Sequence, residues 1–197
     1  MRDRFLHQIE MEREYALKGR KARIVAKMNS LCDRDIIAAL YAAGAAGVKI
    51  DLIVRGICCL KTGIPGVSEN ITVRSNCGKF SGAQQDILFS TATGMRKSLW
   101  GSADWMPRNL DKRVEIVFPV EDERLKEEVK HILEMQLADN VKAHVLQADG
   151  RYEKIDKRGK VLLNSQDYFC EEAWERVSVP ESAGDQRVFV PAEAPED

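Results

Sequence analysis

Apolar positions near the start of the chain change from a helical to a strand spacing. Phe5, Ile9 and Ala16 recur at intervals close to 3.6 residues, which predicts a helix that ends at Gly19. Residues 22–29 are short, β-branched and bounded by polar residues, which predicts a strand. The chain therefore opens with a helix that leads directly into a strand.

A strand–helix–strand unit follows from the spacing of the next residues. Asp33 stands where a helix would begin, Ile36 and Leu40 lie on its apolar face, and Gly47 ends it. Residues 48–54 alternate at first and then become wholly apolar, which predicts a second strand. Because strands joined through a helix run parallel, we expect both strands to be mostly buried.

The rest of the chain predicts strands and helices in mixed order. We expect a loop at 61–70, strands at 71–75, 98–102 and 114–118, a helix at 121–139, a hairpin at 141–155 turning at Asp149 and Gly150, and a helix at 164–176. Residues 76–97 show no clear pattern, and residues 177–197 have the composition of a flexible tail. The expected fold class is α/β, a mixed β-sheet flanked by helices, in one domain over residues 1–176.

Length and composition restrict the class of protein. A chain of 197 residues, 44% of them hydrophobic, is close to the size of one domain with a single core. No segment reaches the roughly 18 apolar residues of a membrane span, and the charged amino terminus does not resemble a signal peptide. The five cysteines contain no C-x-x-C pair, which disfavours a disulfide framework or a zinc cluster. We expect a cytoplasmic protein with no metal site.

Charge is unevenly distributed, although the formal net charge is only −1. Residues 18–113 carry 16 Lys and Arg against 7 Asp and Glu, and the remainder of the chain is acidic. A basic segment of this kind is expected in a domain that binds an anion. A solvated surface with segregated charges would give the same counts, so both interpretations stay open.

Basic and polar residues close the first two predicted strands. Lys27 and Asn29 stand at the end of the first strand, and Arg55 and Gly56 follow the second. Ligands of open α/β sheets gather outside the carboxyl ends of the strands. A guanidinium there can hold phosphate oxygens through two hydrogen bonds, and a glycine lets the backbone approach closely. The alternative is an ion pair between Arg55 and a neighbouring aspartate.

A second polar cluster fills residues 102–113, between two predicted strands. It holds two acids, three bases, a hydroxyl and an amide in twelve residues. Arg108 and Arg113 are its candidates for contact with a polyanion, whereas a loop whose charges neutralise one another is the simpler alternative. The phosphate loop G-x-x-x-x-G-K-[ST] and the fingerprint G-x-G-x-x-G are absent from the sequence.

Several motifs, in order along the chain, resemble the carboxy-terminal domain of bacterial polyphosphate kinase. They read K-M-N-S-L at 27–31, D-L-I-V-R-G-I-C at 51–58, G-V-S-E-N-I at 66–71, S-A-D-W-M-P-R-N at 102–109 and L-A-D-N-V-K-A at 137–143. The resemblance covers roughly residues 5–174 and implies a phospholipase-D-like fold. It further implies transfer of the terminal phosphoryl group of ATP to polyphosphate, within a longer chain whose phosphohistidine domain is not part of this sequence. The arginine that contacts the nucleotide phosphates in this family matches Arg55.

One departure from the family pattern concerns its second active-site histidine. Aligned without gaps from Gly78, Ala83 stands where that histidine is expected, and the arginine that follows is replaced by Gln85. Alanine neither donates a proton nor stabilises charge on a transferring phosphoryl group. We therefore expect the chain to be inactive alone, with no catalytic residue and no cofactor of its own. Mg²⁺ would enter with ATP only as part of a complete kinase.

Three functions remain open from the sequence. The chain could supply half an active site to a separate chain that carries the histidine domain, bind polyphosphate or a nucleotide without catalysis, or serve as a structural subunit. Binding would use Arg55 with Lys27, Asn29, Arg108 and Arg113. Nucleic acid is disfavoured because no basic stretch is interleaved with aromatic residues.

Overall fold

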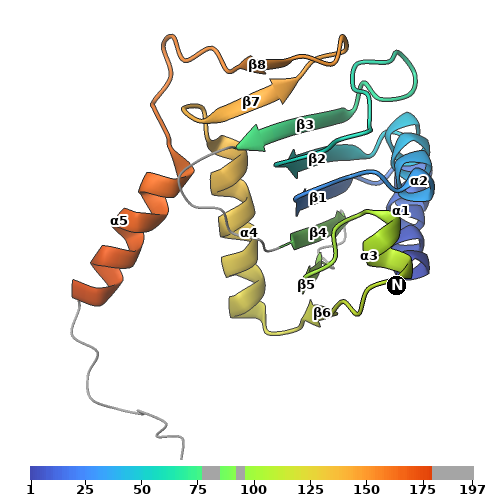
Figure 1. Cartoon of the computed structure of the whole chain (residues 1–197), viewed down its shortest axis with the longest axis horizontal. Helices are drawn as coiled ribbons and strands as arrows, with labels where there is room; N and C mark the ends of the chain where they lie inside the picture. The colour runs from blue at the N-terminus through green and yellow to red at the C-terminus, as the bar shows by residue number, and fades with distance from the viewer. Residues whose placement is uncertain (77–84, 92–95, 179–197) are drawn as a thin grey trace, which may run out of the picture.

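The computed structural model describes residues 1–76, 85–91 and 96–178, which form five helices and eight strands. The helices are α1 (Arg2–Leu17), α2 (Arg34–Ala45), α3 (Pro107–Asp111), α4 (Glu123–Ala138) and α5 (Ser165–Ser178). The strands are β1 (Ala22–Met28), β2 (Lys49–Val54), β3 (Ile71–Asn76), β4 (Gln85–Thr91), β5 (Arg96–Gly101), β6 (Val117–Val120), β7 (Ala143–Leu146) and β8 (Tyr152–Lys154). Helices flank both faces of one sheet, as expected (Figure 1).

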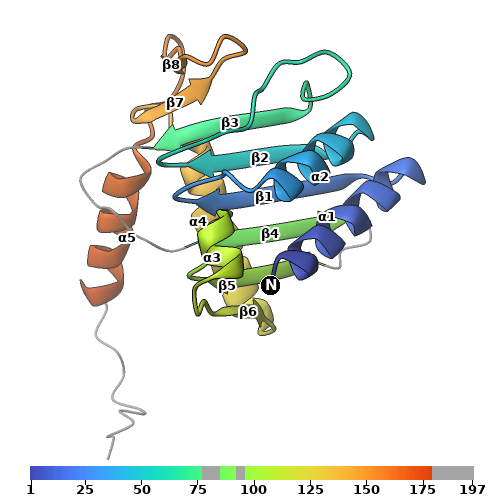
Figure 2. The ribbon, with the colours of Figure 1, turned by 45° about the vertical axis from the view of Figure 1, so that its right-hand side comes forward.

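The strands lie in the order β6-β5-β4-β1-β2-β3-β7-β8. β1 pairs parallel with β2 and β2 with β3, while the other neighbours are antiparallel. The parallel β1–α2–β2 unit confirms the sequence-based prediction, and the Asp33 side chain caps α2 by accepting a hydrogen bond from the Ile36 amide. Because β1, β2 and β3 are parallel, their carboxyl ends meet along one side of the sheet, called the carboxyl edge below (Figure 2).

Two apolar clusters hold the helices against the sheet. On one face, Ile24 and Met28 of β1 pack in a cluster with Phe5 and Ile9 of α1, and Trp105 is fully buried in it. On the other face, Val25 of β1 and Ile53 of β2 pack against Val129 and Leu133 of α4. The alternation of β1 residues between the two faces explains why a central strand reads as nearly continuous apolar sequence.

The structure differs from the prediction in three places. Residues 76–97 contain β4, whose position is set by pairing with β1 and β5 on either side rather than by a local pattern. β6 pairs with β5 only from Val117, and Val114, expected within this strand, is fully exposed, so the predicted start was wrong. The short helix α3 lies where a loop was expected, and it begins at Pro107, a residue that suits the first helical turn because its missing amide donor needs no partner there.

The hairpin and the last helix follow the prediction closely. β7 and β8 pair antiparallel, and Gly150 in the turn between them has a φ of 88°, which favours glycine. α5 extends through Ser178, and the remainder of the expected tail lies outside the described residues, as does Ala83. Within the described ranges, none of the helices is long and apolar enough to cross a membrane.

Candidate functional site

A cleft of about 430 Å³ lies at the carboxyl edge, between the strand ends, α4 and α5. Two of the residues predicted from the sequence, Lys27 and Arg55, line it. Lys142 adds a third cationic side chain, and Trp100 and Phe169 add aromatic surface. The cleft therefore combines positive charge with apolar walls, as expected for a site that holds an anionic group of a larger molecule.

Lys27 reaches the cleft because of its register in the sheet. It lies beside Ile53 of β2, and it follows Val25 on the face that α4 covers. Only 8% of Lys27 is exposed. A lysine whose stem is buried in this way presents its ammonium group at a fixed place rather than over a wide surface.

Arg55 is fixed by the residue that closes the neighbouring strand. Its Nε and Nη2 donate to Oδ1 of Asn29, at 2.9 and 2.5 Å. The Gly56 amide donates to the Asn29 carbonyl at 2.8 Å, and a Cβ at Gly56 would stand 3.0 Å from the same oxygen. Gly56 thus allows the ends of β1 and β2 to approach closely.

Asp104 holds the end of β1 from the other side. Its Oδ1 accepts hydrogen bonds from the Asn29 and Ser30 amides, at 2.7 and 3.1 Å, and Asp104 is 8% exposed. From the sequence, Asp104 was one of the acids of the 102–113 cluster with no assigned partner. Its contribution is structural, since it orders the backbone that carries Asn29.

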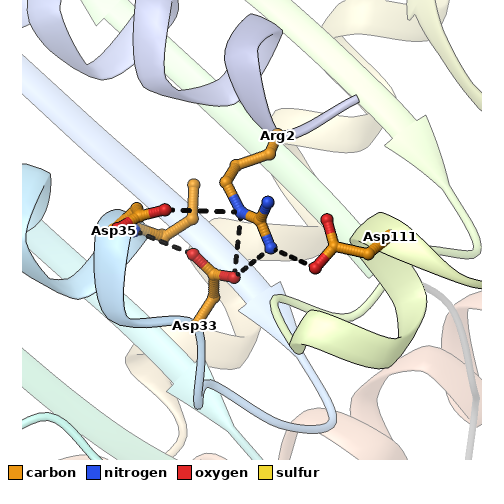
Figure 3. A network of polar contacts seen from close by, with 5 residues as sticks. Arg2, Asp33, Asp35 and Asp111 are labelled. Atoms are coloured by element: carbon orange, nitrogen blue, oxygen red, sulfur yellow. Dashed lines mark hydrogen bonds and ion pairs between the residues drawn. The ribbon is translucent and has the colours of Figure 1, made fainter.

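The start of α1 secures α3 next to this edge. Arg2 donates to Asp33, the cap of α2, at 2.8 Å and to Asp111 of α3 at 2.7 Å, as Figure 3 shows. The hydrogen bond from Arg2 holds the pKa of Asp111 below its usual value. Arg108 lies on α3, so Arg2 holds in place the helix that carries Arg108.

The predicted site residues separate into two groups. Lys27, Asn29 and Arg55 come together at the carboxyl edge. Arg108 and Arg113 are exposed, and neither lines the cleft as the described residues define it. The structure therefore does not bring Arg108 and Arg113 to the cleft that Lys27 and Arg55 line.

Asp139 is a cleft residue that sequence reasoning missed. It is fully buried; its Oδ1 accepts from the Val141 and Lys142 amides at 2.9 and 2.8 Å, and its Oδ2 accepts from the Ser165 amide and hydroxyl at 2.9 and 2.8 Å. Burial acts to raise the pKa of Asp139, but these hydrogen bonds outweigh it and leave the pKa below its usual value. The motif at 137–143 contained this aspartate, but no pattern linked it to Ser165.

The same hydrogen bonds decide whether the cleft suits a metal ion. Asp139 is the one carboxylate among the described residues that line the cleft, and both of its oxygens are engaged by main-chain and hydroxyl donors. Mg²⁺ prefers carboxylate and other oxygen ligands in near-octahedral geometry. The described lining therefore does not fit a resident Mg²⁺.

α5 closes one side of the cleft and rests on α4 through His131. His131 Nε2 lies 3.4 Å from Oε1 of Glu172, and its ring centroid lies 5.8 Å from that of Tyr168 and 6.2 Å from that of Phe169. Phe169 also lines the cleft. The position of Phe169, an aromatic residue that lines the cleft, thus depends on the contact between α4 and α5.

Comparison with known proteins places the chain in a family. The family model "Polyphosphate kinase C-terminal domain 2" matches residues 1–166. The polyphosphate kinase of Prosthecochloris aestuarii is 51% identical over 179 residues, which are 90% of this chain and 25% of that protein. The polyphosphate kinase of Pseudomonas aeruginosa is 50% identical over 159 residues, 81% of this chain and 23% of its own length. The chain thus spans about a quarter of the length of the relatives it matches.

The solved structure of one polyphosphate kinase agrees with the sequence comparison. The crystal structure of polyphosphate kinase from Porphyromonas gingivalis matches with a TM-score of 0.85 and 34% identity, over 90% of this chain and 27% of that one. Nuc from Salmonella typhimurium, a phospholipase D family member, matches with a TM-score of 0.45 and 18% identity, over 73% of this chain and 89% of that one. With the family model covering most of its length, the chain belongs to the family of polyphosphate kinase C-terminal domains.

Proposed function

We propose that this domain binds the phosphates of ATP or polyphosphate at the carboxyl edge and supplies one part of a phosphoryl-transfer site. The observation that carries the proposal is the convergence of Lys27 and Arg55 in one cleft, at the strand ends where α/β sheets bind ligands. The relatives that support the substrate class are named polyphosphate kinase. Phosphoryl transfer depends on cations that hold the phosphates and stabilise their developing charge, and Lys27 and Arg55 are suited to that work.

The proposed role is incomplete in this chain. The sequence has Ala83 at the position of the family's second histidine and Gln85 at that of the following arginine. The proposal therefore assigns catalysis to a site completed by a histidine-bearing domain, in this or another polypeptide, and predicts no phosphoryl transfer by the 197 residues alone. Mg²⁺ would arrive with the nucleotide, because both oxygens of Asp139, the one carboxylate in the described lining of the cleft, are engaged by hydrogen-bond donors.

A second candidate is a binding module that has lost catalysis altogether. The observation that favours it is the same alanine, since loss of a proton donor removes a contribution of about 10²–10⁴-fold in rate while leaving the phosphate contacts in place. Both candidates predict phosphate binding that needs Arg55. They differ in whether addition of a histidine-bearing domain produces phosphoryl transfer.

The experiment that tests the proposal is calorimetric titration of the chain with medium-length polyphosphate and with ATP, at two salt concentrations. We expect binding that weakens as salt rises and weakens about tenfold or more in Arg55→Ala, since a charge-assisted bidentate contact is lost. Lys61→Ala, which removes a lysine from the loop before β3, is the matched control and should bind like the wild type. Absence of binding at low salt would refute both candidates and leave a structural subunit.

A further inference from the structure

Beyond β1 and β2, the chain continues as two short segments that lie side by side. The Leu31 amide donates to the Ile57 carbonyl at 2.9 Å, and the Cys59 amide donates to the Leu31 carbonyl at 2.9 Å. Together these hydrogen bonds make a parallel β-bridge between Leu31 and Cys58. Because the next residues of two parallel chains are also neighbours, the bridge brings Cys32 beside Cys59.

Side-chain alternation along these two segments separates the cysteines. Leu31 is fully buried, and Cys58 packs against the same apolar core, where its Sγ donates to the Leu60 carbonyl at 3.8 Å. Because successive side chains of an extended segment point to opposite sides, the residues that follow, Cys32 and Cys59, turn away from that core. Cys32 is half-buried and Cys59 is exposed. The bridge therefore places two thiols on the same side, toward the surface.

The thiols of Cys32 and Cys59 are in contact. Burial, together with a hydrogen bond to the Cys59 side chain, raises the pKa of Cys32 to about 11. Cys32 therefore stays protonated at neutral pH, and Cys59 is the more accessible of the two. An oxidant from solution meets Cys59 first, with the Cys32 thiol next to it.

We propose that Cys32 and Cys59 are a site of reversible oxidation, at which a peroxide converts the two thiols into a disulfide. One peroxide oxygen transfers to the Cys59 thiolate, which becomes a sulfenic acid as hydroxide is released. The Cys32 sulfur then attacks the Cys59 sulfur: the S–S bond forms, the S–O bond breaks, and the hydroxyl group leaves as water with the Cys32 proton. In all, the two thiols give up two electrons and two protons, and hydrogen peroxide becomes two molecules of water.

This inference does not rest on the proposed function. Neither of the two cysteines lines the cleft as the described residues define it. The disulfide would join the segment before α2, where Asp33 caps the helix, to the segment that follows Gly56. A dithiol reductant would break it again, so the bond is a transient one of the kind that a reducing compartment permits.

Peptide mapping of the oxidised chain tests the assignment. Trypsin cuts on both sides of each segment, so Cys32 falls in the peptide 28–34, and Cys58 and Cys59 fall in the peptide 56–61. The folded chain is treated with a small excess of hydrogen peroxide, and its remaining thiols are blocked before digestion. We expect the two peptides to be linked, dithiothreitol to separate them, and tandem mass spectrometry to place the bond on Cys59. A bond within the second peptide, or none to the first, would refute the proposal.

Serine variants separate the roles of the two thiols. Cys59→Ser should abolish the linked pair of peptides. Cys32→Ser should also abolish it and should leave Cys59 as a sulfenic acid that dimedone labels, because the second thiol is gone. Cys170→Ser removes another exposed cysteine, on α5, and should form the link as the wild type does. Thermal melts of the reduced variants establish that each is folded.

Oxidation in urea tests whether the fold is what places the pair. In the folded chain we expect the Cys32–Cys59 link to exceed any other cysteine pairing by about tenfold or more, since thiols held in contact react at a high effective concentration. In urea that unfolds the chain, the excess should disappear because the bridge between Leu31 and Cys58 is lost. Equal selectivity in both conditions, or dimedone labelling of Cys32 in Cys59→Ser with none of Cys59 in Cys32→Ser, would overturn the inference.

Discussion

At the scale of single residues, two buried acids on this fold have opposite electrostatic surroundings. Glu12 of α1 is 3% exposed, and its Oε2 has no hydrogen-bond partner in the part of the chain that the structure describes. Burial therefore raises the pKa of Glu12 to about 7, against smaller opposing effects of the Arg23 backbone and the Lys97 charge. Asp139 is equally buried, but its four hydrogen bonds hold its pKa below the usual value. The number of donors, rather than burial alone, decides the direction.

The Glu12 environment predicts an acid whose ionisation opposes folding. Because its folded pKa is about 7 and its ordinary value is 4.5, the folded state binds the proton more tightly, and stability falls as pH rises through this interval. We expect Glu12→Gln to be more stable than the wild type above pH 7, by about 1–3 kcal/mol, with the gain shrinking toward pH 4.5. Urea unfolding between pH 5 and 9 measures this, and a gain that does not change with pH would contradict it.

The Asp139 environment predicts the opposite pH dependence. Its folded pKa lies below 3.8, so its stabilisation is complete at neutral pH and is lost as pH falls through that folded value. Asp139→Asn turns one acceptor oxygen into a donor that faces other donors, and we expect a loss of about 1–3 kcal/mol at pH 7 that narrows below pH 4. Asp156→Asn, in an exposed loop pair with Arg158, is the control and should change stability little. Equal losses in the two variants would contradict the assignment.

At the scale of elements, the position of α5 depends on its packing against α4. Its described contacts with α4 centre on His131, Tyr168 and Phe169. We expect His131→Ala to loosen α5 and to speed amide hydrogen exchange across Ser165–Ser178 while leaving exchange in β1 and β2 unchanged. His7→Ala, on the exposed side of α1, should change neither. Unaltered exchange in α5 would show that the contacts of His131 do not hold the helix in place.

Elements were predictable where their own residues specify them. The β1–α2–β2 unit has a side-chain cap at Asp33 and a clear apolar period, and α4 has the same features. β4 and α3 were missed because neighbouring strands, and the Arg2 contact to Asp111, define them from a distance. The same distinction applies to the residues of the site. The positions of Lys27, Asn29 and Arg55 at the ends of predicted strands indicated that they would lie close together. The hydrogen bonds between Asp139 and Ser165 join residues 26 positions apart, and no local sequence pattern predicts them.

At the scale of the whole molecule, the proposed phosphate binding uses the cleft, and the proposed catalysis requires groups outside it. Its described lining provides cations and aromatic walls, and no histidine is among these residues. The chain corresponds to about a quarter of its relatives, so the remaining groups are expected from the rest of such a protein. A domain that holds phosphates rigidly while another supplies the reacting side chain gains its rate from orientation, and misplacement of about 1 Å is costly.

This division of labour predicts the behaviour of a chimera. We would replace the matching quarter of the Prosthecochloris aestuarii polyphosphate kinase, 51% identical over 179 residues, with this chain. On the proposal that Ala83 stands at the histidine position, we expect the chimera to bind polyphosphate but to synthesise it slowly, and Ala83→His to raise the rate by about 10²–10⁴-fold. Ala148→His, in the exposed hairpin turn, is the control and should have no effect. A chimera as active as its parent without the substitution would show that position 83 does not carry the missing function, whereas a rescue specific to Ala83→His would show that this domain retains the geometry of a kinase and lacks one imidazole.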